Sequence, residues 1–223
     1  MGDRIERVSP VPGKNTVIVQ SGAARFEIAR TTAVELGLAP GIELAAPLRA
    51  ALAAAAARRQ AAARVLRWLR GRPRTERDVR CFLLDRAYDA DVVDSVVAGL
   101  RAQGLVDDAR FARWFVDARV ARRPESFAVL AAALAAQGVP PDVVASALSA
   151  CRDQHDEMQL ALAAARQRLR AVRSVPPARA AARLGRFLAG RGFDADTVRA
   201  VCRTCLGDIA DADDVGPGQA AWE

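Results

Sequence analysis

The sequence contains few of the residues that catalytic and metal centres commonly use. His155 is the only histidine, Lys14 is the only lysine, and aromatic residues make up 5% of the 223 positions. No Gly-x4-Gly-Lys-Ser/Thr segment is present, which excludes a phosphate-binding loop of that type. We therefore expect a protein that binds a partner rather than an enzyme, with no catalytic residues and no cofactor.

The cysteines also lack a metal-binding pattern. Cys202 and Cys205 are spaced as Cys-x-x-Cys, but no second pair accompanies them, and the other two cysteines, Cys81 and Cys151, stand alone. A structural zinc site needs four ligands, and helical periodicity continues through the Cys-x-x-Cys pair. We expect these thiols to have structural roles and no metal to be bound.

The adjacent carboxylates of Asp107 and Asp108 are the other candidate for metal binding. They stand where a helix is expected to begin, and neighbouring residues at a helix start point in different directions. N-cap hydrogen bonding and interaction with the helix dipole account for both residues. We therefore interpret the pair as mainly structural.

Long hydrophobic runs are absent. The apolar run from Ala50 to Ala57 is rich in alanine and too short to span a bilayer. The first residues, from Met1 to Glu6, have no apolar core of the kind that a secretion signal needs. We expect a cytoplasmic protein that does not contact a membrane.

The sequence has a basic charge balance carried by arginine. The formal net charge is +7 and the isoelectric point is near 10.4. An excess of this kind favours a polyanionic partner, and the planar arginine side chain binds phosphate well. The sequence therefore predicts a partner that is nucleic acid or carries acidic surface.

One pattern recurs three times, and it predicts tandem helical repeats. The segments from Leu83 to Val97, Leu134 to Leu148 and Leu188 to Cys202 align without gaps. In each of them a small residue precedes an apolar one, and an aspartate and a valine follow. The small residues are Ala87, Gly138 and Gly192, and the aspartates are Asp91, Asp142 and Asp196. A glycine just past a helix permits the left-handed residue that ends it, and a fixed repeat of about 50 residues is typical of stacked supersecondary units.

The caps of these helices can also be expected from the sequence. Asp89 and Asp194 suit the N-caps of the second helices of their units, and Pro141 suits a first helical turn. Thr75, followed by Glu76 and Asp78, is expected to open another helix. Each unit would then contain a helix, a turn and a helix, with one more helix before them.

The two ends of the chain differ from the repeats. Thr16–Gln20 and Arg25–Ala29 are rich in β-branched residues on either side of a Ser-Gly turn, which predicts a β-hairpin. The last residues are acidic and rich in small residues, which predicts a disordered tail. The expected divisions are an N-terminal element at 1–45, repeats at 46–104, 105–154 and 155–206, and the tail at 207–223. The fold class is mainly α.

The arginines are the candidate contact residues. Arg179, Arg183 and Arg186 are spaced to share one helix face, and several others cluster in each repeat. The full set is Arg64, Arg67, Arg74, Arg77, Arg110, Arg113, Arg119, Arg166, Arg170, Arg173, Arg179, Arg183 and Arg186. Trp68, Trp114 and Phe115 could stack on bases, but helical periodicity turns them inward, so we expect them in the core.

The motifs of the repeats resemble those of RecX, the regulatory protein of the bacterial recombinase RecA. The matching residues of the first repeat are Arg74, Thr75, Glu76, Asp78, Val79, Leu83, Val97, Leu100, Gly104 and Leu105. Those further along the chain, which we interpret as mainly structural, are Asp107, Asp108, Phe111, Ala112, Gly192 and Phe193, with Val116 and Arg119 completing the central motif. The resemblance extends from about residue 64 to about residue 206.

This resemblance implies a specific function. RecX proteins are elongated, curved helical arrays that lie in the groove of the RecA filament on DNA. They span neighbouring subunits and modulate, mostly by inhibition, the ATPase, strand-exchange and coprotease activities in DNA repair. The resemblance therefore implies a regulator whose partners are the RecA filament and DNA bound without sequence specificity. We expect a monomer.

One departure from the family and two alternative functions remain open. The second repeat usually carries basic residues before its Leu-x3-Leu motif, whereas here Ser126–Leu134 is rich in alanine. The chain could instead be a DNA-binding protein that reads duplex grooves through helix-turn-helix units. Its candidate reading helices, however, begin at acidic residues that would repel phosphate, Asp89 and Asp194. The second alternative is a helical adaptor for another protein.

Overall fold

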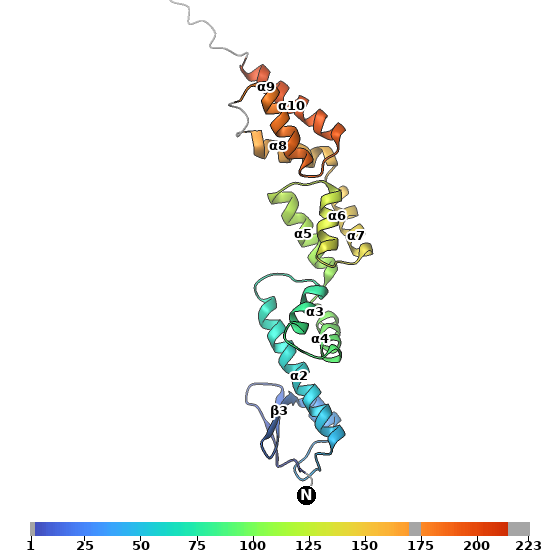
Figure 1. The fold of residues 1–223 in the computed structure, drawn as a ribbon. Coiled ribbons are helices and arrows are strands. Elements are labelled where there is room, and N and C mark those ends of the chain that lie inside the picture. The colour runs from blue at the N-terminus through green and yellow to red at the C-terminus, as the bar shows by residue number, and fades with distance from the viewer. Residues whose placement is uncertain (1–2, 170–174, 214–223) are drawn as a thin grey trace, which may run out of the picture. The chain divides into compact units, whose positions relative to one another are not determined.

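The computed structural model describes residues 3–169 and 175–213, and these are mainly helical (Figure 1). Contacts divide the chain into two compact units, Met1–Asp107 and Asp108–Glu223. The first unit contains β1 (Arg7–Pro10), β2 (Thr16–Ser21), β3 (Ala24–Ala29), α1 (Arg30–Glu35), α2 (Ala46–Leu69), α3 (Glu76–Leu84) and α4 (Ala90–Ala102). The second contains α5 (Asp108–Arg122), α6 (Phe127–Ala136), α7 (Pro141–Arg152), α8 (Glu157–Leu169), α9 (Pro177–Ala189) and α10 (Ala195–Asp213).

The N-terminal element is a three-stranded antiparallel sheet in the order β1-β2-β3. The expected hairpin is confirmed as β2 and β3, in which Val19 pairs with Phe26. Alternate residues of the hairpin, including Val17, Val19 and Ile28, are buried, as expected for a sheet with one covered face. Strand β1 was not expected, because it is short and ends in a proline, a residue that β-strands tolerate only at edges.

Helix α2 joins this sheet to the first helical repeat (Figure 1). Leu52 and Ala55 belong to the core beneath the sheet. Ala61 and Val65 belong to the core that α2 forms with α3 and α4. Successive residues of a helix turn by about 100°, so Leu52 and Ala61 lie on nearly opposite sides of α2. One continuous helix is therefore shared by two hydrophobic cores.

The helix starts and stops that the sequence indicated are mostly confirmed. Thr75 and Asp78 form a capping box at the start of α3, with 3.1 Å between the Asp78 nitrogen and the Thr75 hydroxyl. Asp194 accepts the Thr197 N–H at 2.8 Å before α10, and α7 begins at Pro141 as expected. Asp89 is the exception. It occupies the N-cap position of α4, but its side chain makes no capping hydrogen bond.

The second and third repeats share one core in the second unit. Phe111, Leu130, Leu148, Leu160 and Leu184, which come from α5 to α9, belong to a single cluster of buried side chains. Phe111, which we interpreted as mainly structural, is thus part of the core. Extensive contacts of α5 with α7, and of α8 and α9 with α10, hold the helices of this unit together.

Two expectations need correction. Trp114 is 46% exposed, although we expected it in the core; the ring of Phe111 lies beside it, and Phe111 and Phe115 take the inward positions of α5. Helix α10 continues to Asp213, beyond the expected start of the tail after Leu206. The rest of the expected tail, residues 214–223, lies outside the described residues.

Candidate anion-binding surfaces

Two of the candidate arginines of the first unit lie against aromatic rings. The rings of Trp68 and Phe82 stack with 4.4 Å between their centroids, and the Arg74 guanidinium lies 4.1 Å from the centroid of Trp68. Burial is the main reason that the pKa of Arg74 is lowered; Arg72 lowers it further and Asp78 opposes the shift. Arg64 lies 5.9 Å from the ring of Tyr88. Two of the candidate residues are therefore fixed against rings rather than extended freely into solvent.

The remaining candidates of the first unit, Arg67 on α2 and Arg77 on α3, are exposed. Helix α3 also takes part in a network of ion pairs, in which Glu76 pairs with Arg80 at 3.4 Å and with Arg101 at 3.8 Å. Arg80 also pairs with Asp94. The basic surface of the first repeat is thus partly neutralised within the repeat.

The candidates of the second unit differ in their surroundings. Arg110 and Arg113 on α5 and Arg166 on α8 are exposed, whereas Arg119 is half-buried and paired with Glu125. Arg170 and Arg173 lie outside the described residues. The described candidates therefore differ in exposure and in ion pairing within each unit.

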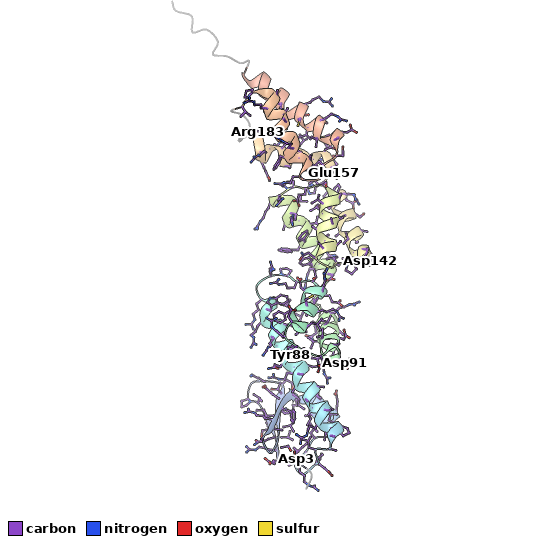
Figure 2. The ribbon with its side chains drawn as sticks, in the orientation of Figure 1. Asp3, Tyr88, Asp91, Asp142, Glu157 and Arg183 are labelled. Carbon is purple, nitrogen blue, oxygen red and sulfur yellow. The ribbon has the colours of Figure 1, made fainter. Side chains whose placement is uncertain are left out.

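Helix α9 presents the clearest basic face. Arg179, Arg183 and Arg186 are all exposed, and Figure 2 labels Arg183 among them. Leu184 and Leu188 of the same helix are fully buried in the core of the second unit. The helical spacing thus separates an arginine face from an apolar face, as the sequence predicted.

A group of charges that the sequence reasoning missed lies where the second and third repeats meet. Glu125 is buried, and its two carboxylate oxygens accept from Arg119 at 2.6 Å and from Arg123 at 2.8 Å. Arg191 donates to the backbone oxygen of Pro124 at 3.1 Å. The sequence does place a glutamate directly after Arg122-Arg123-Pro124. This short segment does not reveal that the glutamate side chain is buried.

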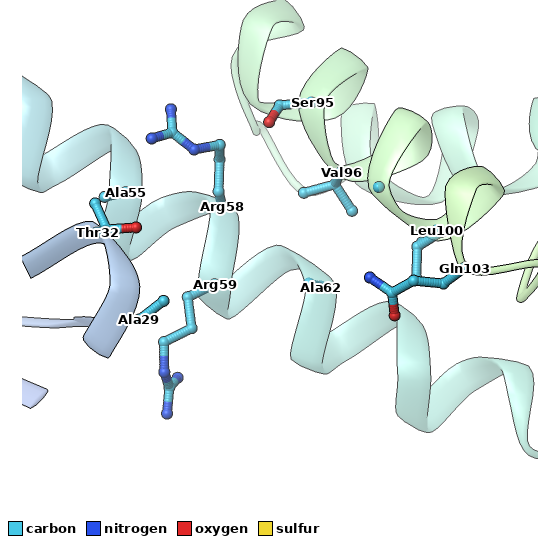
Figure 3. A pocket seen from close by; sticks show the side chains of 11 residues that line it. Ala29, Thr32, Ala55, Arg58, Arg59, Ala62, Ser95, Val96, Leu100 and Gln103 are labelled. Carbon is cyan, nitrogen blue, oxygen red and sulfur yellow. The ribbon is translucent and has the colours of Figure 1, made fainter. Parts of the chain in front are cut away.

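The first unit contains a hollow of about 310 Å³ beside α2 (Figure 3). Arg58 and Arg59 point to opposite sides of α2 at this place. Arg59 pairs with Glu27 of β3. Val96 and Leu100 of α4 supply an apolar wall. The walls are mixed in character, and no group of polar side chains converges on one point.

A second hollow, of about 370 Å³, lies between α5 and α7. Arg113, His155 and the buried Cys151 line it. Burial, with a smaller contribution from Asp117, raises the pKa of the Cys151 thiol, so this thiol is a poor nucleophile at neutral pH. The histidine does not cap α8; Asp156 accepts the Gln159 N–H at 2.6 Å instead.

Two other kinds of site are absent from the part of the chain that the structure describes. Within residues 3–169 and 175–213, no group of three or more His, Cys, Asp or Glu residues is placed to hold a metal ion. In the same part of the chain, no helix has both the length and the apolar character needed to cross a membrane.

Comparisons with known proteins agree with the repeat architecture. Three family models match in succession: the first three-helix domain of RecX at residues 61–100, the second at 107–148 and the third at 155–202. "Regulatory protein RecX" of Mycobacterium ulcerans (strain Agy99) is 39% identical over 152 residues, covering 68% of this chain and 86% of that protein. The protein of the same name from Chlorobaculum tepidum is 29% identical over 143 residues, covering 64% of this chain and 86% of that one.

Solved structures show the same fold. A crystal structure of regulatory protein RecX superposes with a TM-score of 0.73 at 22% identity, covering 89% of this chain and 98% of that one. The crystal structure of RecX from Lactobacillus salivarius gives a TM-score of 0.57 at 15% identity, covering 67% and 96%. On the strength of its three matched domains and its identity to the mycobacterial protein, the chain belongs to the RecX family of regulatory proteins.

Proposed function

We propose that this protein binds the RecA filament on DNA and slows its ATP hydrolysis at substoichiometric levels. The observation that carries the proposal is the succession of three RecX domains that bear exposed arginines, most clearly on α9. Each repeat adds length along a filament. The arginines supply attraction to DNA phosphates and to acidic filament surface.

Direct reading of duplex DNA is the less favoured alternative. The helices α4 and α10 begin next to Asp89 and Asp194, and Asp91 and Asp196 follow in their first turns. Helix-turn-helix proteins place the start of the recognition helix against base edges and phosphates. Exposed carboxylates at both starts would be repelled there. The acidic starts of α4 and α10 favour a protein partner together with non-specific DNA contact.

The proposal is tested by replacing Arg179, Arg183 and Arg186 together with glutamine. Exposed substitutions of this kind usually leave stability within about 0.5 kcal/mol, so the fold should survive. Inhibition of the RecA ATPase should weaken, and the salt dependence of binding should flatten by up to about three phosphate contacts. The measurement is ATP hydrolysis by a RecA filament on single-stranded DNA, titrated with each protein.

A matched control removes the same charge from another part of the chain. Arg7, Arg25 and Arg30 are exposed residues of the N-terminal element that lie outside the candidate set. Their triple glutamine variant should inhibit as the wild type does. Equal inhibition by the α9 variant and the control would show that α9 does not contact the filament. A wild-type protein without effect on any RecA filament activity would contradict the proposed function itself.

A further inference from the structure

Two turns of the second unit are bound to each other. The turn between α5 and α6 contains Pro124 and Ser126, and the turn between α9 and α10 contains Arg191 and Gly192. The Ser126 N–H donates to the Arg191 backbone oxygen at 3.1 Å, and the Arg191 guanidinium donates to the Pro124 oxygen at 3.1 Å. A Cβ on Gly192 would lie 2.5 Å from the Ser126 hydroxyl. The two turns are therefore in close contact.

This contact assembles three arginines around one buried carboxylate. The Glu125 side chain is only 3% exposed, and Arg119 and Arg123 each donate to one of its oxygens. Arg191, held on Pro124, is the third guanidinium beside them. We call these four residues the Glu125 cluster. Removing one partner of a buried ion pair is costly, so the carboxylate fixes its arginines firmly.

The cluster has more positive charge than its carboxylate neutralises. Three guanidiniums and one carboxylate leave an excess of two positive charges. The pKa of Arg191 is lowered, first by burial and then by the positive charge of Arg123, and Arg119 acts in the same direction; Glu125 opposes this shift. The arginines thus repel each other, and an external anion would relieve that repulsion.

The guanidiniums also retain N–H donors beyond these contacts, and two of them lie against aromatic rings. Each arginine carries five N–H donors. The contacts described above use one nitrogen each on Arg119, Arg123 and Arg191. Arg119 lies 5.0 Å from the ring centroid of Phe115, and Arg191 lies 4.7 Å from that of Phe187. The side chains of Arg119 and Arg123 are 34% and 58% exposed, so an anion from solution can reach them.

We propose that the Glu125 cluster binds a backbone phosphate of DNA, with Glu125 as the residue that positions the arginines. A nucleic acid is favoured over an acidic peptide because a second cation continues the site: Arg168 lies 5.7 Å from the same Phe187 ring that Arg191 contacts. Neighbouring phosphates along a nucleic-acid strand can each be contacted by one of several neighbouring arginines. The inference rests on the proposed DNA contact and adds a specific site to it.

The first test measures DNA affinity with charge-matched variants. The double variant Arg123→Gln and Arg191→Gln should bind a labelled oligothymidylate about tenfold more weakly, with a salt slope reduced by about one phosphate contact. The control is the double variant Arg122→Gln and Arg203→Gln, which removes two exposed arginines of the same unit from outside the cluster. It should lose less than about threefold. Fluorescence anisotropy over a range of NaCl concentrations gives both quantities.

The second test separates positioning from simple charge. Glu125→Gln removes one negative charge, so the net charge of the site becomes more positive by one. It also removes the carboxylate that orients the arginines. If charge alone mattered, DNA affinity would rise; the positioning role predicts that it falls. Far-UV circular dichroism checks the fold of each variant. If Glu125→Gln does not fold, the exposed single variant Arg123→Gln takes its place and should weaken binding relative to Arg122→Gln.

The outcomes distinguish this site from the broader function. DNA binding by the double variant equal to that of its control would overturn the site but leave the DNA contact of the wild type intact. Competition by polyglutamate as effective as competition by oligothymidylate would also overturn it, in favour of an acidic partner. A wild type that inhibits RecA but binds no DNA would overturn the site while the RecA interaction stands.

Discussion

At the scale of single residues, three equivalent positions share an unusual backbone conformation. Ala87, Gly138 and Gly192 all have positive φ, at 56°, 78° and 83°. These are the small residues that recur in the sequence pattern, and each lies just after a helix. The left-handed conformation costs a residue other than glycine about 1–2 kcal/mol, so Ala87 bears a strain that the two glycines avoid.

Gly192 is constrained by packing as well as by conformation. A Cβ there would lie 2.3 Å from a methyl group of Val129, whereas a Cβ on Gly104, at φ 64°, would meet nothing within 4 Å. Gly104→Ala should therefore cost about 1–2 kcal/mol from backbone strain alone. Gly192→Ala should cost clearly more, because it also separates the two turns. Chemical denaturation of both variants measures the difference, and equal costs would show that the turns move apart easily.

Residue-level prediction from the sequence succeeded where a local rule applied. The need for glycine at position 192 follows from its place after a helix, and the capping by Thr75 follows from a short motif. The exposure of Trp114 and the burial of Glu125 did not follow. The exposure of Trp114 depends on which neighbouring helix covers which side of α5, and the burial of Glu125 depends on the contact between the α5–α6 and α9–α10 turns. Helical periodicity alone specifies neither.

At the scale of the secondary-structure elements, α5 is anchored by its first two turns. Phe111 is buried, and its ring lies 5.9 Å from that of Phe115. Phe111→Ala should reduce the free energy of unfolding by about 3–5 kcal/mol, because it leaves a cavity in the shared core. Met158→Ala, at a partly exposed position of the same unit, is the control and should cost far less. Thermal melts compare the two; an unchanged midpoint for the Phe111 variant would contradict its burial.

The starts of α6 and α8 are linked by a carboxylate that is partly buried (Figure 2). Glu157 accepts the Phe127 N–H at 3.5 Å, and burial raises its pKa above the usual 4.5. A raised pKa in the folded state means that ionisation opposes folding, so stability is lost as the pH rises through that pKa. Glu157→Gln should therefore be more stable than the wild type at pH 7, and the gap should narrow as the pH falls toward 4.5. The measurement is the melting midpoint of the variant and of the wild type across this pH range. A difference between them that does not change with pH would contradict the burial of the carboxylate.

At the scale of the whole molecule, the three repeats do not correspond to three separate cores. The second and third repeats share one core in the second unit, and the first repeat shares α2 with the N-terminal sheet. The sequence predicted the repeat pattern and the hairpin, because each depends on residues close together in the chain. The grouping of repeats into units depends on packing between distant segments, and the sequence did not reveal it.

This grouping predicts which fragments fold alone. The fragment 1–107 contains both cores of the first unit and should melt cooperatively. The fragment 1–45, cut at the division expected from the sequence, lacks Leu52 and Ala55 and should be unfolded. Circular dichroism of the two fragments tests this. A folded 1–45 fragment would show that the sheet does not need α2.

The double use of α2 restricts how its length can change. The sheet packs near Leu52, and the first repeat packs near Ala61 on the other side of the helix. One alanine inserted after Ala57 would rotate everything beyond it by about 100° and take one of the two faces out of register. An insertion of about seven residues, two full turns, would restore the phase. Natural variation in the length of this helix should therefore occur in whole turns, and single-residue insertions here should be selected against.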